Sequence, residues 1–150
     1  MRGVLGLTAV LLAATAAGGC GMAAQPAPAA SAPPSVPVAL KSTCDALGQA
    51  YGERMAPFAE SLTTLVGQGT PDARKRAQES LAAFATAVDD ATRASQDAAL
   101  RADGKKTADQ LRAKSTDAAF FAGIKTEKDV TTTLGPTLKQ WLTPVTRHCS

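Results

Sequence analysis

Apolar residues recur at steps of three and four along the chain from residue 44 onward. This is the period at which residues return to one face of an α-helix, so it predicts amphipathic helices. No segment combines two-residue alternation with β-branched residues, the pattern typical of strands. Ser42 or Thr43 is the expected N-cap of the first helix. Its apolar stripe comprises Cys44, Leu47, Tyr51, Met55, Phe58, Leu62 and Leu65.

Helix-breaking and helix-capping residues divide this pattern into four predicted helices. Gly67 to Gly69 are expected to end the first helix, since glycine readily adopts the left-handed conformation that closes one. Thr70-Pro71-Asp72 supplies an N-cap, a proline in the first turn and an acidic residue, which together predict the start of the second helix. The second apolar stripe is expected to run from Ala73 to Ala98. Asp103-Gly104 is expected to end this helix.

The two remaining predicted helices lie nearer the C-terminus. A third, weaker helix is expected over residues 105–124. The caps in Thr126-Glu127-Lys128-Asp129 then predict a fourth helix, which would extend to Cys149. Proline lacks an amide hydrogen and disturbs the preceding turn. Pro57 is therefore expected to kink the first helix, and Pro136 and Pro144 to interrupt the fourth.

Four amphipathic helices joined by short connections predict an all-α fold, a small up-down-up-down four-helix bundle over residues 39–150. A segment of this size suits a single domain with one modest core. The whole chain has only four Phe, one Trp and one Tyr. The core must therefore be built mainly from Leu, Val and Ala.

The N-terminal region has the order of features found in an export signal. Arg2 is the only charged residue before Lys41, residues 4–17 are mostly apolar, and Ala17-Gly18-Gly19 directly precede Cys20. This arrangement resembles the lipobox of bacterial lipoproteins, although a lipobox usually carries Leu where this chain has Ala17. The resemblance implies that residues 1–19 are removed as a signal peptide and that Cys20 is lipidated. It places the protein on the outer face of the cytoplasmic membrane.

Residues 20–38 are rich in Ala and Pro and carry no charge. Their five prolines exclude a helix and favour extended, polyproline-like conformations, as expected of a tether between the lipid and the domain. A proline-rich recognition motif is the alternative interpretation of this segment.

The chain has three cysteines, an odd number for an exported protein. If lipid occupies Cys20, then Cys44 and Cys149 remain, and an oxidising compartment permits a disulfide between them. In an up-down bundle the start of the first helix and the end of the fourth lie at the same end, where these two residues fall. Two separate free thiols are the alternative.

The sequence lacks the motifs of most enzyme classes. There is no HExxH or CxxC pattern, and His148 is the sole histidine, so a metal site is not expected. Gly104-Lys105-Lys106-Thr107 lacks the earlier glycine of a nucleotide-binding loop. The carboxylates lie on predicted solvent faces, where nothing would raise a pKa for acid–base work. We expect no enzyme and no cofactor. The formal charge of +3, or +2 without Arg2, does not indicate nucleic acid.

Two binding surfaces are predicted. Prolines in the first and fourth helices could part them and open an apolar groove for a lipid-like or peptide ligand. The residues expected to line it are Tyr51, Met55, Phe58 and Trp141. Basic residues at the disulfide end would attract anionic headgroups. They are Lys41, Arg101, Lys105, Lys106 and Arg147.

The sequence thus favours a lipid-anchored extracytoplasmic module that acts by binding or structural contact, with the membrane and a cell-surface protein as expected partners. A carrier of a lipid-like or other apolar ligand is one alternative function. A secreted soluble helical protein is another.

Overall fold

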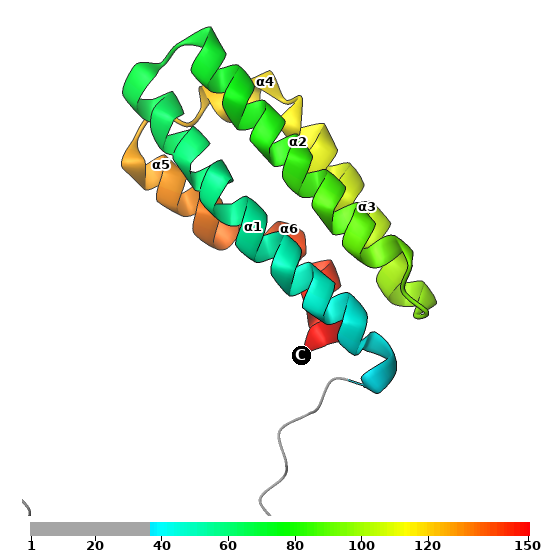
Figure 1. The fold of residues 1–150 in the computed structure, drawn as a ribbon. Coiled ribbons are helices and arrows are strands. Elements are labelled where there is room, and N and C mark those ends of the chain that lie inside the picture. Colours follow the sequence, from blue (N-terminus) through cyan, green and yellow to red (C-terminus); the bar gives the residue numbers. More distant parts are fainter. Residues whose placement is uncertain (1–36) are drawn as a thin grey trace, which may run out of the picture. The chain divides into compact units, whose positions relative to one another are not determined.

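The computed structural model describes residues 37–150, and in this part of the chain all regular structure is helical (Figure 1). The prediction of an all-α fold is therefore confirmed. The predicted count of four helices is not, because the second half of the domain is divided into shorter pieces. The elements are α1 (Val38–Gln68), α2 (Pro71–Arg93), α3 (Ala98–Ser115), α4 (Ala118–Ala122), α5 (Glu127–Thr132), the π-helix η1 (Thr133–Thr137), α6 (Leu138–Thr146) and the 3₁₀-helix η2 (Arg147–Cys149).

The three long helices lie side by side and alternate in direction (Figure 1). Helix α1 packs along α2, α2 packs along α3, and α3 contacts α6. The segment α5–η1–α6 runs back beside α1, so the C-terminus lies near the start of α1 (Figure 1).

The turn between α1 and α2 agrees with the prediction. Gly69 closes α1 in the left-handed conformation, with φ of 62°, and its N–H donates to the carbonyl of Leu65. The Thr70 hydroxyl accepts from the Ala73 N–H and Pro71 opens α2, as expected. At its other end α1 begins at Val38, before the expected cap at Ser42 or Thr43.

The predicted boundary between the second and third helices is wrong. Helix α2 ends at Arg93, and Asp97 caps α3 by accepting from the Leu100 N–H at 2.7 Å. Short polar side chains that bond to nearby backbone N–H groups favour such turns over continued helix. Gly104, the expected terminator, lies inside α3.

The third helix is also shorter than the predicted 105–124. Helix α3 ends at Ser115, and the carboxylate of Asp117 accepts from the Phe120 N–H at 3.0 Å to start α4. A second N-cap within the expected helix therefore divides it.

The fourth helix begins where predicted. Thr126 and Asp129 form a reciprocal capping box at the start of α5. The expected interruptions take a milder form: helical structure continues past Pro136 and Pro144, and Pro136 lies in the π-helix η1. The wider π turn accommodates a residue that cannot make the regular α-helical hydrogen bond. Likewise, α1 continues through Pro57.

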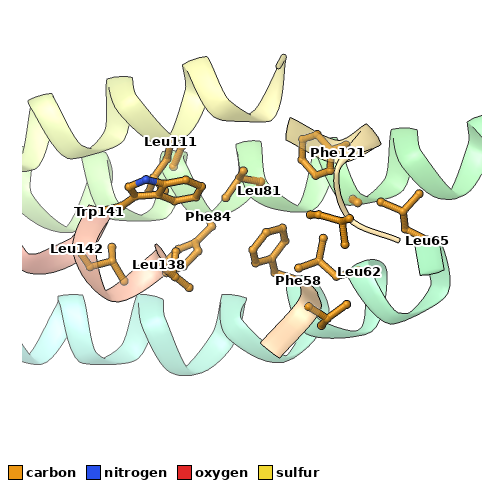
Figure 2. Close-up of a cluster of buried hydrophobic side chains, with 14 of the residues drawn as sticks. Phe58, Leu62, Leu65, Leu81, Phe84, Leu111, Phe121, Leu138, Trp141 and Leu142 are labelled. Carbon is orange, nitrogen blue, oxygen red and sulfur yellow. The ribbon is translucent and has the colours of Figure 1, made fainter. Parts of the chain in front are cut away.

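The core lies between the helices and is largely aliphatic with a few aromatic side chains (Figure 2). Several of its large side chains are completely buried, including Phe58, Leu62, Leu81, Leu111 and Leu138. Trp141 from α6 lies beside Leu111 from α3 in Figure 2 and is also buried. Small residues complete the packing, in particular the buried Ala73 and Ala77 of α2.

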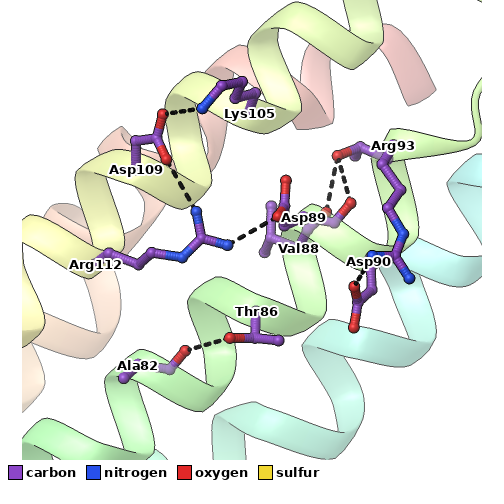
Figure 3. Close-up of polar contacts among 10 residues, drawn as sticks. Ala82, Thr86, Val88, Asp89, Asp90, Arg93, Lys105, Asp109 and Arg112 are labelled. Atoms are coloured by element: carbon purple, nitrogen blue, oxygen red, sulfur yellow. Dashed lines mark hydrogen bonds and ion pairs between the residues drawn. The ribbon is translucent and has the colours of Figure 1, made fainter.

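Polar side chains of α2 and α3 contact one another (Figure 3). Arg112 of α3 bonds to Asp89 of α2 at 2.9 Å and to Asp109 at 2.9 Å, and Lys105 also bonds to Asp109. The hydrogen bond from Lys105, more than the one from Arg112, lowers the pKa of Asp109 below its ordinary value. Exposed pairs of this kind contribute little to stability. Side-chain packing therefore determines how closely the two helices approach.

Helices α2 and α3 approach each other closely at Gly104. A Cβ atom at this position would overlap the Thr92 hydroxyl and Cβ and lie 2.8 Å from its Cγ2. Thr92 is fully buried, and its hydroxyl donates to the Val88 carbonyl at 2.9 Å. The side chain therefore has no free space into which it can move.

We expect Gly104→Ala to lower the free energy of unfolding by about 1–2 kcal/mol, because overpacking exceeds the gain in helix propensity. Gly52→Ala in α1 is the matched control, since its Cβ would meet nothing within 4 Å. That variant should be stabilised by about 0.5–1 kcal/mol. Denaturant unfolding of both would check this, and equal stability of the two variants would contradict the close approach.

Candidate functional site

An apolar groove of about 590 Å³ lies between α1 and the η1–α6 segment, with α2 contributing to its lining. This volume is in the range of small-molecule sites. Almost all of the lining side chains are apolar, and none is acidic. The lining consists of Cys44, Leu47, Gly48, Tyr51, Phe84, Val88, Leu134, Gly135, Lys139, Leu142, Val145, Thr146 and Cys149.

Glycine occurs on both walls of the groove. Gly48 of α1 and Gly135 of η1 line it, and a Cβ at either position would meet nothing within 4 Å. Space that a longer side chain would occupy is thus left open. On the α2 side, Phe84 and Val88 are almost completely buried, so the groove has a firm apolar lining there.

The disulfide between Cys44 and Cys149 joins the two walls. Their Cα atoms are 5.6 Å apart although the residues are separated by 105 positions in the sequence. This is the pair predicted from the cysteine count and the helix order. Both residues line the groove, so the bond holds the start of α1 against η2 at this end of it.

Of the four residues predicted to line a groove, only Tyr51 does so. It is 43% exposed, and its ring stands edge-on to Phe84 with centroids 6.0 Å apart. Met55 packs against the core, and Phe58 is completely buried within it. Trp141 is buried and contacts Phe120 with ring centroids 5.5 Å apart. The groove lies between the first and last helical segments, and Met55, Phe58 and Trp141 are not among its lining residues.

Among the described residues, Lys139 is the one charged residue that lines the groove. It lies on the exposed surface at the start of α6, and no carboxylate among residues 37–150 forms an ion pair with it. The other polar groups of the lining are the hydroxyls of Tyr51 and Thr146. Such a site has the chemistry to hold an apolar molecule and to orient a polar end.

A cluster of polar side chains lies at the disulfide end of the domain. The carboxylate of Asp103 bonds to His148 Nε2 at 2.9 Å and accepts from Arg147 at 2.7 Å. The hydrogen bond with His148, followed by the one from Arg147, lowers the pKa of Asp103 below its ordinary value. His148 is therefore engaged with a carboxylate beside the disulfide.

The basic residues predicted to attract headgroups are partly neutralised. Arg147 pairs with Asp103, Lys41 pairs with Asp45, and Lys105 pairs with Asp109. Arg101 donates to the Ser95 carbonyl. These contacts weaken the positive field of this end compared with five unpaired cations.

Within the described part of the chain, no group of three or more His, Cys, Asp or Glu side chains is placed to hold a metal ion. No helix over residues 37–150 has both the length and the apolar character that crossing a bilayer demands. Cys20, the predicted signal peptide and residues 20–36 of the predicted linker lie outside the described residues.

Comparisons of the chain with protein-family models, with curated proteins and with solved structures find no match. Its function is therefore inferred from its own residues and their geometry.

Proposed function

We propose that this protein is an exported lipoprotein on the outer face of the cytoplasmic membrane, whose helical domain binds an apolar ligand in the groove between α1 and α6. The observation that carries the proposal is the groove itself, with its almost wholly apolar lining and its volume of about 590 Å³. Each methylene group that leaves water for such a site contributes about 0.8 kcal/mol to binding.

The anchoring part of the proposal is supported by the cysteines. With Cys44 and Cys149 joined to each other, Cys20 is the one cysteine left over, and it directly follows the signal-like N-terminal stretch. A lipidated Cys20 followed by a proline-rich tether would hold the domain near the bilayer surface. The groove would then lie close to the bilayer, from which an apolar ligand could exchange.

We also propose that α5, η1 and α6 act together as a fourth antiparallel helix. They form one continuous helical run that lies beside α1 and ends at the disulfide. In this description the domain is a disulfide-closed up-down bundle, and the groove lies along the seam between its first and last helices.

Filling the groove provides a test of the binding function. Gly48→Leu places a side chain in the open space of the groove without a backbone clash, whereas Gly52→Leu on the same helix points to open space outside the lining. We expect Gly48→Leu to weaken binding of dodecanol at least tenfold, because the new side chain occupies the ligand's volume. Gly52→Leu should leave the affinity unchanged.

The measurement is isothermal titration calorimetry on the processed chain, residues 20–150, carrying Cys20→Ser so that no attached lipid competes for the groove. Melting curves would confirm that both variants are folded. Wild-type protein that binds no dodecanol would overturn the proposal, as would equal affinity of the two leucine variants. The remaining alternatives would then be structural contact with a cell-surface protein, or a secreted soluble module.

A further inference from the structure

We infer that the ligand of this groove is an anionic amphiphile with a single hydrocarbon chain, whose headgroup pairs with Lys139. The inference rests on the proposed binding function and adds the chemical class of the ligand.

The charge in the lining of the groove is positive only. Among residues 37–150, Lys139 is the one charged side chain of the lining, and none of these lining residues is acidic. Lys139 forms no ion pair within these residues; the same holds for Lys106, Lys125 and Lys128, but none of those three lines the groove. An ammonium at the rim of an apolar groove favours a ligand that is apolar at one end and negatively charged at the other.

The lining disfavours a peptide. A peptide in the groove would bring a backbone N–H and C=O with every residue, and groups left unpaired away from water are costly. Apart from Lys139, the polar side-chain groups of the lining are two hydroxyls, those of Tyr51 and Thr146. A hydrocarbon chain needs no such partners along its length.

The dimensions suit one chain. On α1 the lining extends from Cys44 to Tyr51, seven residue steps that span about 10 Å at the helical rise of 1.5 Å per residue. A single hydrocarbon chain fits within a groove of about 590 Å³.

The test compares dodecanoate with dodecanol, two probes that share one chain and differ in headgroup charge. The protein is the processed chain with Cys20→Ser, titrated calorimetrically at neutral pH below the concentration at which the probe forms micelles. Lys139→Met removes the charge and retains an unbranched side chain. Lys106→Met is the matched control, because it removes an equal charge from an exposed site on α3 outside the lining.

We expect Lys139→Met to weaken dodecanoate binding about two- to fivefold, the size of an exposed ion pair, and to leave dodecanol binding unchanged. Lys139→Glu should weaken dodecanoate further, and added salt should reduce the difference between wild type and Lys139→Met. Lys106→Met should resemble wild type with both probes.

The outcomes separate this inference from the proposed function. If dodecanol binds and Lys139→Met changes dodecanoate affinity no more than Lys106→Met does, the proposed binding function stands. The inference that Lys139 pairs with an anionic headgroup is then wrong. If neither probe binds the wild-type chain, both proposals are overturned.

Discussion

Replacing Cys44 and Cys149 together with serine is expected to lower the melting temperature by roughly 15–30 °C. The disulfide closes a loop of 105 residues, nearly the whole described domain. In the chain-entropy model, a cross-link over a loop of this length contributes about 4–5 kcal/mol by restricting the unfolded chain. This is a large fraction of the stability that a domain of this size normally has.

Circular dichroism melting curves would measure this effect. Reduction of the wild-type protein should produce the same decrease, and a reducing agent should leave the double serine variant unchanged. Because both cysteines line the groove, loss of the bond should also weaken dodecanol binding. A reduced wild-type protein with an unaltered melting curve would contradict the stabilising role of the bond.

Replacing Cys20 with serine is expected to abolish the incorporation of labelled fatty acid into the protein in cells. Lipid attachment requires the thiol, so the effect should be all or none rather than partial. The N-terminal stretch should also remain attached, because lipobox processing acts on the lipidated cysteine.

Metabolic labelling and intact-mass spectrometry would measure both changes. Cys44→Ser is the matched control, since it removes a cysteine that the disulfide uses, and it should retain the label. Persistent labelling of the Cys20→Ser variant would contradict the predicted lipid anchor. A wild-type protein whose mature chain begins at another residue would do so as well.

Local chemistry was sufficient to predict some parts of the fold. The glycine-closed end of α1 and the Thr70-Pro71 start of α2 depend on neighbouring residues only, and both occur as predicted. The capping box at Thr126 and Asp129 is equally local. The disulfide could be predicted because helix order and cysteine count indicated the same pair.

Other parts depend on tertiary contacts that a sequence pattern does not reveal. Gly104 was interpreted as a helix terminator, but it is instead the small residue that lets α3 approach Thr92. Glycine is suited to both roles, and only the packing partner distinguishes them. A different case is the π-helix at Pro136, which keeps the helix continuous where a break was expected.

An apolar stripe in the sequence indicates where two helices face each other, but it does not identify the residues that line a groove between them. The stripes of the first and last helices predicted a groove between these two segments, and Tyr51 lines the groove that lies there. Stripe position does not distinguish a residue that fills the core, such as Phe58, from one beside a gap. The glycines were the informative signal: Gly48 directly follows the stripe residue Leu47, and Gly135 lies one position before the proline of the facing segment.

The most direct test of the account is to locate the ligand on the protein by NMR. Backbone amide shifts of the processed Cys20→Ser chain would be recorded during titration with dodecanol. Binding in the groove predicts that the largest shift changes occur at lining residues of both walls, such as Leu47, Gly48 and Leu142. Changes centred on the α2–α3 surface around Asp89 and Arg112, or spread evenly over the domain, would contradict it.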